Sequence, residues 1–247
     1  MNPTLKLCGL HLAANALLLW LGYEWLSVGE STGARLAFSA VDALAILALA
    51  CWLYGATLVF FGPAEGKLKD AFWTALRHLA PLLVAAIGVI AVYGVIVWLA
   101  AGIGQPAFRV ASWLTMHLRK PVRPATVLRV FEAAIWLVRW VLLPVGLLPM
   151  LHGIAVRGWG GFGDFTWKTG LRYWVTVPVL LLAGVMLPGL LLAWAPRGSF
   201  ALELVSFSLR TLVAYLLFVG SMVTLAERTA SARVRHGAGR KPAPLHG

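Results

Sequence analysis

The chain has 247 residues, of which 60% are hydrophobic and only 12% are charged, and its formal net charge is +12. This composition excludes an ordinary water-soluble domain, because such a domain cannot bury repeated uncharged stretches of about 20 residues. It also argues against nucleic-acid binding, since the basic residues are not interleaved with aromatic residues. We therefore predict an integral membrane protein.

Six segments are long and apolar enough to cross a bilayer. In chain order they are residues 7–27, 36–61, 79–103, 127–152, 174–195 and 203–225. Backbone amides in hydrocarbon need hydrogen bonds within the protein, and these segments lack the two-residue alternation of a barrel strand. The sequence therefore predicts an all-α fold, a polytopic transmembrane bundle of about six spanning helices that forms one domain over residues 1–227.

Three of the segments outside these spans carry predictions of their own. Residues 105–123 are too charged to cross, but apolar side chains between Phe108 and Leu118 recur on one side, which predicts an interfacial amphipathic helix. The glycine-rich residues 158–163 are expected to form an interfacial loop, because they lack the Lys-Ser/Thr pair of a nucleotide-binding loop. Residues 228–247 are rich in Arg, Gly and Pro, which predicts a flexible basic tail.

Basic residues in the connections predict the topology. With a cytoplasmic N-terminus, twelve Lys and Arg residues fall on the inner side and six on the outer side. This count favours both termini in the cytoplasm of a cell with a bacterial-type inner membrane, although the basic cluster from Arg109 to Arg123 then lies outside. The surplus charge near the span ends predicts contact with anionic lipid headgroups.

Two of the inner connections resemble each other. Trp73 and Arg77 precede one proline-containing span, and Trp167 and Arg172 precede another. We expect each Trp to lie at headgroup level and each Arg to meet lipid phosphate where the chain enters the membrane. The similarity is short, so both a duplicated two-helix unit and chance remain as explanations.

Charged residues inside the spans are the main candidates for a functional site, because each costs at least about 2.5 to 3.5 kcal/mol at the bilayer centre. They are Glu24, Asp42, Glu132, Arg139, Glu203 and Arg210. Glu24 and Asp42 are the candidate partners of Arg139 or Arg210. Together the six residues would form either a binding or relay site for a solute, a proton or a lipid headgroup, or a set of interhelical ion pairs.

Other polar residues give no sign of catalysis. His11 and Asn15 lie one turn apart in the first span, which predicts hydrogen bonds between packed helices. We expect no metal site and no cofactor, since no two histidines share a helix at four-residue spacing. No H-E-x-x-H, G-x-S-x-G or CxxC motif is present, so no catalytic residue is predicted.

The resulting functional hypothesis is a non-catalytic membrane component or partner-binding subunit. Its partner would be another membrane protein or a second copy of the chain. The first alternative is a small permease or lipid-handling transporter that uses the intramembrane charges. The second alternative is a membrane-embedded enzyme. A cavity at which Asp42, Glu132 and Arg139 converge would favour transport, whereas direct ion pairing would favour a structural role.

Overall fold

The structure is a computed structural model and describes residues 2–29, 32–62, 67–163, 170–194, 196 and 198–238, the last six of these by their backbone only. Every regular element within these residues is a helix, which confirms the predicted all-α class. Six helical segments of the described chain are long and apolar enough to cross a membrane. The fold therefore fits a membrane location.

Four of the six spans are single helices and two contain a break. The elements are α1 (Pro3–Ser27), α2 (Gly33–Phe60), α4 (Leu79–Ala101), α6 (Pro124–Leu137) joined through η1 (Val138–Leu142) to α7 (Leu143–Arg157), α8 (Leu171–Leu181) joined through η3 (Leu182–Met186) to α9 (Leu187–Ala193), and α10 (Phe200–Ala238). Shorter elements connect them: α3 (Leu68–Arg77), α5 (Gly104–Leu118) and the 3₁₀ helix η2 (Gly158–Gly163).

The two breaks are π-helical and each lies just before a proline. The N–H of Leu143 donates to the carbonyl of Val138, and the N–H of Leu187 donates to the carbonyl of Leu182. The next residues, Pro144 and Pro188, have no N–H to continue the α-helical ladder, so the wider π turn accommodates them. The two π-helical segments contact each other, which places both breaks at the same level of the bundle.

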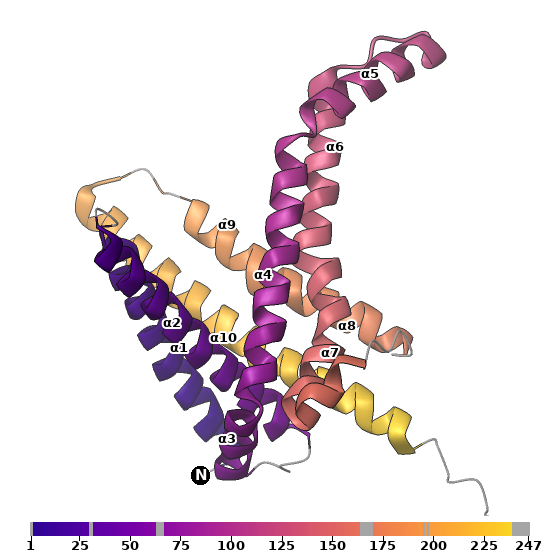
Figure 1. The fold of residues 1–247 in the computed structure, drawn as a ribbon. Coiled ribbons are helices and arrows are strands. Elements are labelled where there is room, and N and C mark those ends of the chain that lie inside the picture. The colour runs from indigo at the N-terminus through magenta and orange to yellow at the C-terminus, as the bar shows by residue number, and fades with distance from the viewer. Residues whose placement is uncertain are drawn as a thin grey trace, which may run out of the picture.

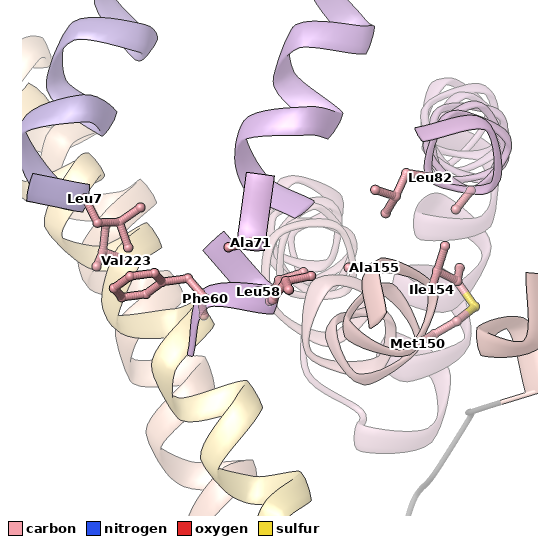
Figure 2. Close-up of a cluster of buried hydrophobic side chains, with 12 residues drawn as sticks. Leu7, Leu58, Phe60, Ala71, Leu82, Met150, Ile154, Ala155 and Val223 are labelled. Atoms are coloured by element: carbon pink, nitrogen blue, oxygen red, sulfur yellow. The ribbon is translucent and has the colours of Figure 1, made fainter. Parts of the chain in front are cut away.

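The largest core cluster lies at one end of the molecule, where five long helices meet. Its buried members come from α1, α2, α3, α4, α7 and α10, and Figure 2 shows them converging: Leu7, Leu58, Phe60, Ala71, Leu82, Met150, Ile154, Ala155 and Val223. At Gly55 an added Cβ would lie 2.7 Å from Leu82 Cδ1, so α2 and α4 approach closely there. His78 Nδ1 donates to the carbonyl of Ala155 over 2.8 Å and ties the start of α4 to α7.

The rest of α4 and α6 leave this core as a projecting arm. We call residues 86–140 the arm; it diverges from α1, α2 and α10, and α5 lies at its far end (Figure 1). No residue of α4 after Ala85 is buried. Within the arm α5 packs on α6 through Ala107, Ala111 and Val127. The part of α4 after Ala85 therefore has no buried residue, and the one buried residue of α6, Val127, packs on α5 rather than on another span.

The structure differs from the sequence prediction in two segments. Residues 228–238 continue α10 as helix, although they were expected to belong to the flexible tail; residues 239–247 lie outside the described chain. Residues 158–163 were expected to form a loop, but they form η2, which packs against α7. An added Cβ at Gly161 would lie 2.2 Å from the backbone of Gly153, so the absence of a side chain permits this packing.

Candidate functional site

Arg139 lies in η1 and faces α4 within the arm. Its Nη2 donates a hydrogen bond of 2.7 Å to the hydroxyl of Tyr93. Its guanidinium carbon lies 4.4 Å from the centre of the Tyr93 ring and 5.7 Å from that of Trp140. Its Nε is buried without an acceptor. Two aromatic faces thus stabilise this cation, and no carboxylate among the described residues neutralises it.

Arg210 has a different environment at the end of α9. Its Nη1 donates to the carbonyls of Leu191 and Leu192 over 3.1 and 3.4 Å, and its Nε donates to Ser206 of its own helix. The guanidinium also lies 5.7 Å from the centre of the Trp194 ring. The last carbonyls of a helix lack intrahelical donors, so Arg210 caps α9. This capping role accounts for a charged residue at this position, so no ligand is needed to explain it.

The four intramembrane carboxylates do not join these arginines. Glu24, Glu132 and Glu203 are exposed, and Asp42 is half-buried. Among the described residues none of them forms an ion pair with Arg139 or Arg210. Neither the pocket between α8 and α10 nor the pocket at the α4–α5 turn is lined by any of the six charges. The charged residues therefore occupy separate places, and the structure brings no cluster together.

His11 and Asn15 lie in a buried hydrogen-bond network between α1 and α2. His11 Nε2 lies 2.6 Å from Thr57 Oγ1, whose own hydroxyl donates to the carbonyl of Leu53 over 2.8 Å. Asn15 Nδ2 donates to the carbonyl of His11 over 2.9 Å and lies 3.3 Å from His11 Nδ1. The Tyr54 hydroxyl donates to Asn15 Oδ1 over 2.6 Å.

These contacts assign one tautomer to His11. Because the Thr57 hydroxyl donates to a carbonyl, His11 Nε2 must carry the proton and donate to Thr57. His11 Nδ1 then accepts from the Asn15 amide, whose orientation is set by its bond to the His11 carbonyl. Every polar atom of the network has a partner, so His11 and Asn15 are explained as the hydrogen-bonded contact between two spans.

We expect Asn15→Leu to lower the stability of the folded protein by about 1–3 kcal/mol, because it leaves His11 Nδ1 and the Tyr54 hydroxyl without partners. Thermal unfolding in detergent measures the change. Ser208→Ala is the control, since Ser208 is exposed and its hydroxyl bonds only within its own helix. Equal unfolding temperatures for Asn15→Leu and the unmodified protein would show that the network does not hold α1 to α2.

The predicted headgroup residues are only partly described. Trp73 and Arg77 lie on one face of α3, where the Arg77 guanidinium is 5.3 Å from the centre of the Trp73 ring. Trp167 lies outside the described residues, so the second Trp of the resemblance has no structural account. Arg172 is exposed in the first turn of α8.

Arg172 lines a pocket between the start of α8 and the last part of α10. The pocket has a volume of about 260 Å³. Its polar lining consists of Arg172, Thr176, Arg228 and Ser231, and its apolar lining includes Tyr173, Val177 and Ala232. The Tyr173 hydroxyl donates to the carbonyl of Val145 over 2.8 Å, which fixes this wall to α7. The arrangement presents two cations and two hydroxyls beside an apolar surface.

Sequence reasoning did not select several residues around Arg139 and in the pocket between α8 and α10. Tyr93 and Trp140 were not linked to Arg139, because aromatic residues in spans are common and carry no mark of a cation–π contact. Arg228 was assigned to the tail, and Thr176 and Ser231 were not considered. Thr176 follows Arg172 by four residues and Ser231 follows Arg228 by three. This spacing places each pair on one face of a helix and was the signal that the sequence offered.

Comparisons with known proteins add no identification. The chain matches no protein-family model, no curated protein and no solved structure.

Proposed function

We propose that the protein is a non-catalytic membrane subunit whose arm binds a spanning helix of another protein. The partner helix carries an Asp or Glu at the depth of Arg139. The observation that carries this proposal is the isolated Arg139 guanidinium, which donates to Tyr93 and leaves a buried Nε without an acceptor. We also propose that both termini are cytoplasmic, as the count of basic residues favours.

A carboxylate would complete the environment of Arg139. A guanidinium has five N–H donors, and a carboxylate accepts two of them side by side. The two aromatic faces supply about 2 kcal/mol in a desolvated site, whereas the cost of the charge in a membrane is about 2.5 to 3.5 kcal/mol or more. An acidic partner helix therefore gains a charge-assisted contact that no described residue of this chain provides.

Exposed apolar side chains lie close in sequence to Tyr93 and Arg139 on the arm. Val92, Val95 and Leu137 are large apolar residues whose side chains are 46%, 55% and 43% exposed on the arm. At Gly88 and Gly94 the space that a Cβ would occupy is open, so a second backbone can approach α4 closely. Apolar packing and one ion pair would thus act together in this contact.

A different chain fits this site better than a second copy does. Two copies related by a two-fold axis along the membrane normal place their Arg139 side chains at the same depth, where the like charges repel. The nearest acidic residue of the arm, Glu132, lies seven residues away, which is about 10 Å along a helix. The acidic group is therefore expected to come from another protein.

Photo-crosslinking in native membranes tests the proposal. A benzophenone amino acid replaces Val92 or Val138 on the arm, and Leu19 of α1, which is 65% exposed, serves as the control position. We expect an adduct from the arm positions only, with a protein whose spanning helix contains a central Asp or Glu. Arg139→Leu should reduce the adduct by at least about tenfold, since one desolvated charge pair is worth more than 1.4 kcal/mol, and Arg139→Lys should reduce it less.

Reversing the two charges provides the decisive control. Arg139→Glu should abolish the adduct, and replacing the partner's acidic residue by Arg should restore it. Absence of an arm-specific adduct would refute the proposal, as would an adduct that persists unchanged in Arg139→Leu. An adduct with a second copy of this chain would assign the arm to self-association and would also overturn the proposed hetero-contact.

A further inference from the structure

We infer that the pocket between α8 and α10 binds a phosphate group, supplied either by an anionic phospholipid or by a small phosphorylated solute. The pocket lies at the boundary of the apolar zone. The uncharged run of α10 ends at Ala226, two residues before Arg228, and the uncharged run of the α8–α9 span begins directly after Arg172. Figure 1 shows the start of α8 and the C-terminal part of α10 on the same side of the molecule.

Two unneutralised cations indicate an anionic ligand. Arg172 and Arg228 come from different helices and line the same pocket. Neither forms an ion pair with a carboxylate of the described chain. An anion in the pocket is attracted by both guanidinium groups, and the attraction is stronger next to an apolar wall than in open water.

The hydroxyl groups favour an oxyanion such as phosphate over a monatomic anion. Thr176 follows Arg172 by four residues, and Ser231 follows Arg228 by three, so each helix presents an arginine and a hydroxyl on one face. Arginine donates paired N–H groups that match phosphate oxygens, and hydroxyls donate to the remaining oxygens. A phosphate has enough acceptor atoms for all four side chains, whereas chloride has no directional acceptors.

The size and apolar wall of the pocket allow more than a bare ion. A water molecule takes about 30 Å³ in the liquid, so the volume of about 260 Å³ also holds a glycerol-sized group. Tyr173, Val177 and Ala232 supply an apolar surface for that group. This inference does not depend on the proposed function, because the pocket and the arm share no residue.

Thermal unfolding of the purified, delipidated full chain tests the inference. The protein in neutral detergent is titrated with phosphatidylglycerol, phosphatidylcholine, sodium phosphate or sodium chloride of equal ionic strength. We expect phosphatidylglycerol, sodium phosphate or both to raise the unfolding temperature by about 5 °C at saturation. Phosphatidylcholine and chloride should raise it by less than half as much.

Matched variants separate the pocket from general charge attraction. Arg172→Gln/Arg228→Gln should lose the shift, and Thr176→Val/Ser231→Ala, which keeps the net charge, should at least halve it. Arg109→Gln/Arg129→Gln removes the same number of exposed charges from the arm and should retain the shift. The hydroxyl variant keeps the test valid if the arginine variant does not fold.

The outcomes also distinguish the two sources of phosphate. A shift with phosphatidylglycerol alone assigns the pocket to a lipid headgroup, and a shift with sodium phosphate as well assigns it to phosphate in solution. The inference fails if neither compound stabilises the protein. It also fails if the pocket variants keep the full shift, or if the arm variant loses as much as they do.

Discussion

Gly161→Ala is expected to lower the free energy of unfolding by about 3 kcal/mol or more, whereas Gly160→Ala changes it by less than about 0.5 kcal/mol. The difference arises because a Cβ at Gly161 would lie 2.2 Å from both the Gly153 carbonyl carbon and the Ile154 nitrogen. These are backbone atoms of α7, so no side-chain rotation relieves the overlap. A Cβ at Gly160, one residue earlier, has nothing within 4 Å.

Folded yield and thermal unfolding in detergent measure this difference. We expect Gly161→Ala to give little monodisperse protein and Gly160→Ala to resemble the unmodified chain. Both variants add one methyl group to the same turn, so helix propensity cannot explain a difference between them. Equal behaviour would show that η2 does not pack on α7 as described.

Gly184→Ala is expected to destabilise the protein by about 1–3 kcal/mol, because α10 leaves no room for a side chain beside η3. A Cβ at Gly184 would lie 2.6 Å from Ser221 Cβ, and the position of neither atom can change by side-chain rotation. Gly189→Ala is the matched control in α9, since the space beside Gly189 is open. Thermal unfolding of the two variants gives the comparison.

A double-mutant cycle identifies the overlap as the cause. Ser221→Gly removes the opposing Cβ but costs about 1 kcal/mol as a glycine within a helix. Adding Gly184→Ala to Ser221→Gly should therefore cost much less than adding it to the unmodified chain. Additive effects would contradict direct packing between η3 and α10.

The spans could be predicted from the sequence, because an uncharged stretch that is long enough to cross a bilayer has few alternatives to a helix. All six predicted spans lie within helices of the structure except at their ends, where the boundaries differ by a few residues. The end of α5 illustrates the limit. The interfacial helix was predicted within residues 105–123, but α5 ends at Leu118 and is followed by Arg119, whose backbone is left-handed with φ of 49°.

The candidate site was less predictable because periodicity gives the face of a residue but not its neighbour. Arg139 was paired with acidic residues on the basis of charge, yet the structure places it against Tyr93. Arg210 was grouped with it, yet its acceptors are backbone carbonyls at the end of α9. Every residue has a backbone carbonyl, so the residue types in the sequence do not indicate which carbonyls accept a hydrogen bond from Arg210. His11 and Asn15 were selected from the sequence, but Thr57 and Tyr54 as their partners were not.

The contact of Arg210 with Leu191 and Leu192 has a consequence for the connection between α9 and α10. A side chain from inside α10 donates to two of the terminal carbonyls of α9. The hydrogen bonds of Arg210 thus hold α9 and α10 together at a position inside α10, away from the connection between the two helices. A longer connection between the two helices is compatible with this contact, because Arg210 lies ten residues after the start of α10.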